Sequence, residues 1–169
     1  MEVALDGFIT ALKVAEAIAN ERWDVNVMPV HMLYRGEGEP IFVPFHHHQV
    51  TLDELKTWAE GMEFTIASML IIAMDSALKE TFGAHPLNDP DVERRAVRCI
   101  IYLIRCSSAH DPIRPVWNIS SGYNKVWEVP SLGIHLNGPA VNGIPVKASD
   151  YGGWSKLKTM TDYVLNQLS

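Results

Sequence analysis

The sequence lacks features that would place it in a specialised class of protein. Its 169 residues contain only two cysteines, Cys99 and Cys106, and no run of about 20 apolar residues that could cross a bilayer. Two cysteines seven positions apart on one helix are separated by about 10 Å of rise, too far for a disulfide. The N-terminus also begins with acidic rather than basic residues, unlike a signal peptide. We therefore expect reduced thiols, no membrane partner and a cytoplasmic location.

The sequence also has no excess of positive charge. The formal net charge is -6, so the protein has no general basic field that would hold nucleic acid, and any such contact must be local. Hydrophobic residues make up 47% and charged residues 20% of the chain, which is typical of globular proteins. Length and composition together predict a single domain over residues 1–169 with an apolar core of its own.

The apolar spacing predicts a helical architecture with β elaborations. Residues 2–22 have the pattern of an amphipathic helix, and residues 25–45 read as a β-hairpin around the turn-like segment RGEGEP. Thr51 and Glu54 form a capping-box pattern before a long periodic run to about residue 82, which Gly83 can end.

A second long helix should follow at about residues 90–107, with Asp89 as its cap and Pro90 in its first turn. Two long helices joined by a short loop are expected to pack antiparallel. The segment after residue 111 predicts a small β and loop region, and a helix should close the chain at 153–168. The predicted fold class is therefore α+β, mainly α, a helical bundle built on the two long helices.

One face of the second long helix is basic. On a helical wheel a set of cationic and aromatic side chains falls within an arc of about 100°: Arg94, Arg95, Arg98, Tyr102 and Arg105. Such a local stripe suits phosphate. The alternative is a solvated face whose arginines pair with neighbouring acids such as Asp91 and Glu93.

The stripe ends at Arg105, and His110 follows about one turn later. A guanidinium and an imidazole acting on one substrate group can cleave RNA. The imidazole exchanges protons with the 2′-hydroxyl or the leaving 5′-oxygen, and the guanidinium stabilises charge on the five-coordinate phosphorus. This chemistry requires no metal and no cofactor. The alternative is that Arg105 interacts with the dipole of the helix end and His110 begins a turn.

The segment Arg105-Cys-Ser-Ser-Ala-His110, at the end of the second of two long helices, resembles the Arg-x4-6-His motif of the HEPN superfamily. The likeness covers mainly residues 51–117. It implies a metal-independent endoribonuclease, often a homodimer, with Arg105 and His110 as the catalytic pair. On this interpretation Arg94, Arg98, Tyr102 and Arg114 guide the RNA, and a toxin–antitoxin or defence role with a neutralising partner protein is a further expectation.

Two other functions fit the same residues. Active members of that superfamily commonly carry Asn, Asp or His after the arginine, whereas this chain has Cys106, so a catalytically inactive HEPN-like module that binds a partner protein or a nucleotide is one alternative. An unrelated helical-bundle interaction protein is the other.

The consecutive histidines His46, His47 and His48 raise the question of a metal, possibly with His31. Successive strand residues point to alternate faces, so the three cannot converge on one ion, and we predict no metal site.

Overall fold

The computed structural model describes residues 2–22, 31–34, 41–44, 51–109, 111 and 114–168. The chain divides into two compact units, residues 1–9 with 64–169, and residues 10–63. The boundary between the units falls within the first two helices. The expectation of one domain over the whole chain stays a prediction.

The unit of residues 10–63 holds most of helix α1 (Glu2–Ala19), the start of helix α2 (Leu52–Phe82) and a two-stranded antiparallel hairpin. The hairpin pairs β1 (His31–Tyr34) with β2 (Ile41–Pro44), with His31 opposite Pro44. The predicted hairpin is therefore confirmed. The capping box at the start of α2 is confirmed too, since Thr51 N donates to a Glu54 carboxylate oxygen at 2.8 Å and Glu54 N donates to Thr51 Oγ1 at 3.3 Å.

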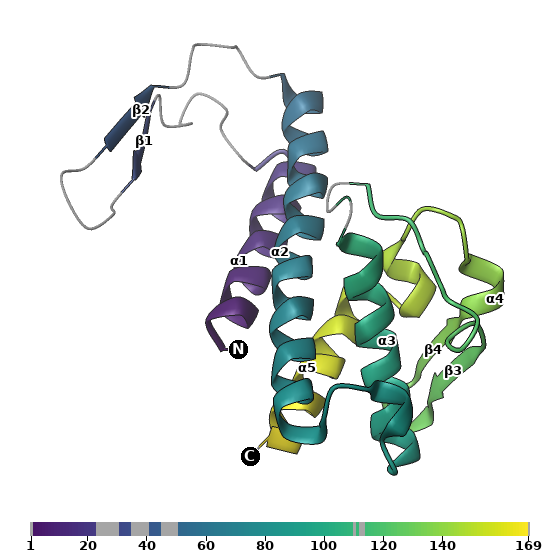
Figure 1. The fold of residues 1–169 in the computed structure, drawn as a ribbon. Helices are drawn as coiled ribbons and strands as arrows, with labels where there is room; N and C mark the ends of the chain where they lie inside the picture. The colour runs from purple at the N-terminus through teal and green to yellow at the C-terminus, as the bar shows by residue number, and fades with distance from the viewer. Residues whose placement is uncertain are drawn as a thin grey trace. The chain divides into compact units, whose positions relative to one another are not determined.

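The larger unit is built on the rest of α2, on α3 (Val92–Ser108) and on α5 (Trp154–Leu168). Between α3 and α5 lie a second antiparallel hairpin and a short helix, namely β3 (Val126–Val129), β4 (Ile134–Asn137) and α4 (Gly138–Val141). Figure 1 shows α3 between the later half of α2 and this hairpin. The structure confirms the α+β, mainly α, class with a β region before the last helix.

Side-chain contacts confirm that α2 and α3 run antiparallel. Asp75 of α2 pairs with Arg105 at the end of α3, and Phe82 at the end of α2 lies under Arg94 at the start of α3. Helix α5 runs in the direction of α2. Its first residue, Trp154, packs edge-on against Phe64 at 5.1 Å between ring centroids, and Gln167 near its end accepts from Arg94, which lies over Phe82 at the end of α2. Buried apolar residues of the three helices form the core of this unit: Leu70, Ile71, Met74, Leu78, Val97, Ile100, Ile101, Ile104, Leu157, Met160 and Val164.

The turn between α2 and α3 corrects one detail of the sequence prediction. Gly83 ends α2, as predicted, with the positive φ of +87° that glycine adopts readily, and its N–H donates to Lys79 O. The N-cap of α3, however, is Asp91, whose carboxylate accepts from Arg94 N at 2.7 Å, and not Asp89. Asp89 follows the 3-10 turn at Pro86–Asn88. Its carboxylate is bound by the side chains of Arg94 and Arg98 and also accepts from the backbone N–H of Asp91 at 3.1 Å.

Asp89 is 2% exposed and its pKa is lowered to about 2. Burial alone would raise this pKa, but hydrogen bonds from Arg94 and Arg98 outweigh that effect. Because the folded-state pKa lies below the ordinary 3.8, the ionised carboxylate stabilises the fold above about pH 4, and this stabilisation disappears as the pH falls toward 2.

We expect Asp89→Asn to lower the free energy of unfolding at pH 7 by roughly 3–5 kcal/mol, because it leaves two guanidinium groups without their counter-ion in a buried site. Chemical denaturation measured at pH 7 and at intervals down to pH 2 tests this. The wild type should lose about 2 kcal/mol over the acidic range through this group. The variant should lack that loss.

The matched control is Asp162→Asn, which removes a carboxylate 2.7 Å from Lys158 in an exposed i,i+4 pair. Its cost should stay below about 1 kcal/mol. Equal costs for the two variants would contradict the assignment of Asp89 as the anchor of the turn.

Candidate functional site

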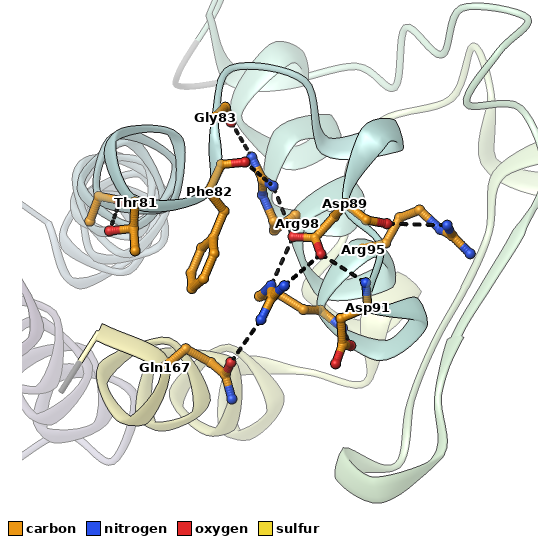
Figure 2. Close-up of polar contacts among 10 residues, drawn as sticks. Thr81, Phe82, Gly83, Asp89, Asp91, Arg95, Arg98 and Gln167 are labelled. Carbon is orange, nitrogen blue, oxygen red and sulfur yellow. Dashed lines mark hydrogen bonds and ion pairs between the residues drawn. The ribbon is translucent and has the colours of Figure 1, made fainter.

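The arginines of the predicted basic stripe divide into two groups along α3. Near its start, Asp89 binds both Arg94 and Arg98 (Figure 2). Arg94 makes a two-pronged contact, with its Nε 2.8 Å from Asp89 Oδ2 and its Nη2 2.8 Å from Oδ1. The Nη1 of Arg98 lies 2.9 Å from the same Oδ2.

Arg98 also closes the turn at the end of α2. Its guanidinium donates to the carbonyl oxygens of Phe82 and Gly83 (Figure 2). Carbonyl groups at the C-terminal end of a helix have no backbone N–H donor in a following turn, so the side chain takes that place. The residue is 2% exposed and all its described contacts are with protein. Arg98 is thus placed inside the fold, and its predicted role in guiding RNA stays a prediction.

Arg94 is partly enclosed by the same cluster. Its guanidinium lies over the Phe82 ring at 4.1 Å from the centroid, and its Nη1 donates to Gln167 of α5 at 3.4 Å. The side chain is 17% exposed. It shares the Asp89 carboxylate with Arg98, and its pKa is raised, chiefly by its hydrogen bond to Asp89. We therefore assign Arg94 to holding α3 against α2 and α5.

Arg105, at the other end of α3, lies in a more open setting. Its side chain is 32% exposed, and its Nε lies 2.8 Å from Asp75 Oδ2 of α2 in an ion pair that lacks the alignment of a hydrogen bond. Lys79 Nζ contacts the same oxygen at 2.5 Å. Two cations therefore share one carboxylate that is itself 6% exposed, so this end of the stripe keeps a net positive charge.

Aromatic and thiol groups surround the Arg105 guanidinium. Its Cζ lies 5.4 Å from the centroid of the Tyr102 ring, and its Nη2 donates to Cys106 Sγ at 3.7 Å. The pKa of Tyr102 is raised, first by its hydrogen bond to Cys106. Tyr102 thus lies beside Arg105, as the stripe predicted.

A pocket of about 490 Å³ opens where α3 ends. It is within the size range of small-ligand sites. Its lining comes from the last turn of α3, the segment after it and the two residues that follow α4: Cys106, Ser107, Asp111, Arg114, Val116, Trp117, Asn118, Asn142 and Gly143. The predicted RNA-binding residue Arg114 is exposed here, and its backbone N–H donates to Asp111 Oδ1 at 2.9 Å.

Buried neighbours hold the floor of this pocket in place. Trp117 is 1% exposed, and its indole N–H donates to Asp150 at 2.8 Å. Asn142 Oδ1 accepts from the backbone of Ile119 at 2.9 Å. The side-chain amides and one guanidinium of the lining can bind a polar or anionic ligand.

His110 lies outside the described residues, and so do His46, His47 and His48. The separation of His110 from Arg105 is therefore untested, although the residues on either side of it, Ala109 and Asp111, are described. Among the parts of the chain that the structure describes, no three His, Cys, Asp or Glu side chains are grouped to hold a metal. No helix of these parts is long and apolar enough to span a membrane.

Sequence reasoning missed the partners of the arginines. The alternative of a solvated face named Asp91 and Glu93 as possible partners, whereas in the structure the carboxylates paired with these arginines are Asp89 and Asp75. Asp75 is the charge that interrupts the most apolar part of α2, and this interruption is the signal that could have indicated a cationic partner. Tyr123 stacks on Tyr102 at 4.9 Å between ring centroids, and no pattern in the sequence indicated that it would lie beside the stripe.

Comparison with known proteins adds no relative, since no family model, no curated protein and no solved structure matches this chain significantly.

The two cysteines should differ in reactivity. Cys99 is fully buried and burial raises its pKa to about 12, whereas Cys106 is partly exposed beside Arg105. We expect a disulfide reagent at pH 8 to modify one thiol rapidly in the folded protein and the second only after denaturation. The test is to measure how many equivalents of the reagent's thiolate are released per protein before and after denaturation.

Cys106→Ser should abolish the rapid reaction and leave the slow one, and Cys99→Ala should do the reverse. Two rapid equivalents in the folded wild type would contradict the placement of Cys99 in the core.

Proposed function

We propose that this protein is a metal-independent endoribonuclease of the HEPN type, with Arg105 and His110 as its catalytic pair. The observation that carries the proposal is the position of Arg105. It lies in the last turn of α3, next to the pocket lined by its neighbour Cys106, with its guanidinium held by Asp75 and its side chain still 32% exposed. A guanidinium fixed in this way is preorganised for charge that develops on a phosphate.

In the proposed reaction an imidazole of His110 takes the proton of a ribose 2′-hydroxyl. The 2′-oxygen then attacks the adjacent phosphorus, and the bond to the 5′-oxygen breaks as that oxygen receives a proton from an imidazolium. The products are a 2′,3′-cyclic phosphate and a 5′-hydroxyl end. Arg105 stabilises the extra negative charge on the five-coordinate phosphorus, so no metal or cofactor takes part.

Arg114 is the second cation of the proposed site. Its position on the pocket suits contact with a phosphate that flanks the scissile one, while Asn118 and Asn142 offer amide groups to a base. Arg94 and Arg98 are used within the protein, so they support α3 in the proposal and do not touch RNA.

The test is incubation of purified protein with a labelled, unstructured RNA in EDTA. We expect cleavage to cyclic-phosphate ends that falls at least about a hundredfold in Arg105→Ala and in His110→Ala, since each removes a transition-state contact. Arg22→Ala, which removes an exposed arginine at the end of α1, is the matched control and should cleave normally. Unchanged cleavage in both site variants would refute the proposal.

A catalytically inactive binding module is the second candidate. It is favoured by the acidic net charge and by the ion pairing of Arg105, which together weaken the attraction of long RNA. The pocket beside Arg114 would then take a nucleotide or a segment of a partner protein, such as the neutralising partner of a cytoplasmic toxin or defence system. Wild-type protein that binds a nucleotide but cuts no RNA would support this candidate.

We also propose that the protein acts as a homodimer, so that two motifs serve one cleft. Two large apolar side chains one turn apart on α2 support this, since Met69 is 62% and Ile72 is 51% exposed. We expect sedimentation to report a dimer for the wild type and a monomer for the double variant Met69→Lys, Ile72→Glu.

The control for this experiment is Val126→Lys, which changes an exposed apolar residue on β3 and should leave the dimer intact. A wild type that sediments as a monomer at all concentrations would remove the shared cleft from the mechanism.

A further inference from the structure

A strip of aromatic rings and cations leads away from Arg105 across α3 and the start of β3. We call it the aromatic–cation strip, and it consists of Lys79, Tyr102, Arg105, Tyr123 and Lys125, with the Trp127 ring beneath its far end. Only Tyr102 and Arg105 of this set belong to the stripe seen on the helical wheel. The other members come from α2 and from the segment before β3.

The rings of the strip form a continuous series. Tyr102 and Tyr123 are stacked with an interplanar angle of 28° and a centroid separation of 4.9 Å. Tyr123 is followed by Trp127 at 6.5 Å. The two tyrosines are partly exposed, whereas Trp127 is 4% exposed and fixes the series to the core. Part of each tyrosine ring therefore remains within reach of a ligand.

A cation stands at each end of the ring series. Lys79 Nζ lies 5.8 Å and Arg105 Cζ 5.4 Å from the Tyr102 centroid, and Lys125 Nζ lies 4.4 Å from the Trp127 centroid. Asp75 is the carboxylate paired with the first two. Three cations and one carboxylate leave a positive surface on an acidic protein. The rings could pack on one another without these cations, so packing alone does not explain the positive charge.

Arg105 joins this strip to the pocket. Its guanidinium faces Tyr102 of the strip and contacts Cys106, which lines the pocket. A phosphate held by Arg105 would therefore have one flanking nucleotide at the pocket and the other over the tyrosines.

We propose that the aromatic–cation strip binds unpaired nucleotides of RNA on one side of the scissile phosphate, which makes single-stranded RNA the substrate class. Rings interleaved with cations bind single strands, because each unpaired base has a π-face for stacking while the cations follow the backbone. Bases of an A-form duplex are stacked on each other and do not offer these faces. This inference rests on the proposed action on RNA.

The experiment measures binding separately from cleavage. In a His110→Ala background, fluorescence anisotropy is recorded with a labelled, unstructured 12-nucleotide RNA and with the same strand annealed to its complement. The variants added to that background are Tyr123→Leu, Tyr123→Phe and Lys125→Ala. Lys158→Ala, which removes an exposed lysine of α5, is the matched control. Circular dichroism checks that each variant folds.

We expect the single strand to bind at least about tenfold more tightly than the duplex, and Tyr123→Leu to weaken it about tenfold by removing a stacking ring. Tyr123→Phe should bind as the parent does. Lys125→Ala should lower the slope of log K against log salt by about 0.7, the effect of one lost phosphate contact on a single strand. Lys158→Ala should leave affinity and slope unchanged.

The outcomes separate this inference from the proposed function. Binding that depends on Tyr123 and Lys125 in a protein that cuts no RNA supports the strip and refutes the nuclease. Cleavage by the wild type together with unaltered binding in Tyr123→Leu and Lys125→Ala refutes the strip alone. Equal affinity for the duplex also overturns the inference, and absence of RNA binding overturns both.

Discussion

The buried carboxylate of Asp89 is the constraint on which the larger unit depends. Through Arg98 it is linked to the last carbonyl groups of α2, and through Arg94 to Gln167 near the end of α5. One side chain therefore ties the turn, the start of α3 and the last helix together. The ionised form is the one the cluster requires, because two guanidinium groups without a counter-ion would be buried at a cost of several kcal/mol.

This anchor sets the register of α2 against α3, and the register determines what surrounds Arg105. With the turn fixed at Gly83 and Asp89, Asp75 lies opposite Arg105 and Lys79 lies near Tyr102. The exposed end of α3 thus receives its electrostatic environment from a contact made at the other end of the helix. The ion pairs of Asp89 and the ion pair of Arg105, which we propose to be functional, are different parts of the same helix pairing.

Much of the fold could be predicted from the sequence because its signals are local. The Thr51 and Glu54 box, the Gly83 stop and the apolar spacing act within a few residues, and each appears where it was expected. The site could be predicted in part. A helical wheel places Arg98 and Arg105 on one face, but it contains no information on depth, and depth depends on what packs against each turn. Hence Arg98 became a buried ligand of Asp89, while Arg105 stayed partly exposed.

This division of the arginines bears on the kind of RNA that the proposed enzyme would select. Counterion release scales with the number of phosphates a protein neutralises, and the cations left outside the Asp89 cluster near the motif are few in a chain of net charge -6. Charge alone would then give weak binding to any polynucleotide. The affinity must come from contacts that paired nucleotides do not offer, and partly exposed tyrosines beside Arg105 are the groups in the described part of the chain that supply them. The sparse positive charge and the proposed selectivity for unpaired strands would then both follow from one helix register.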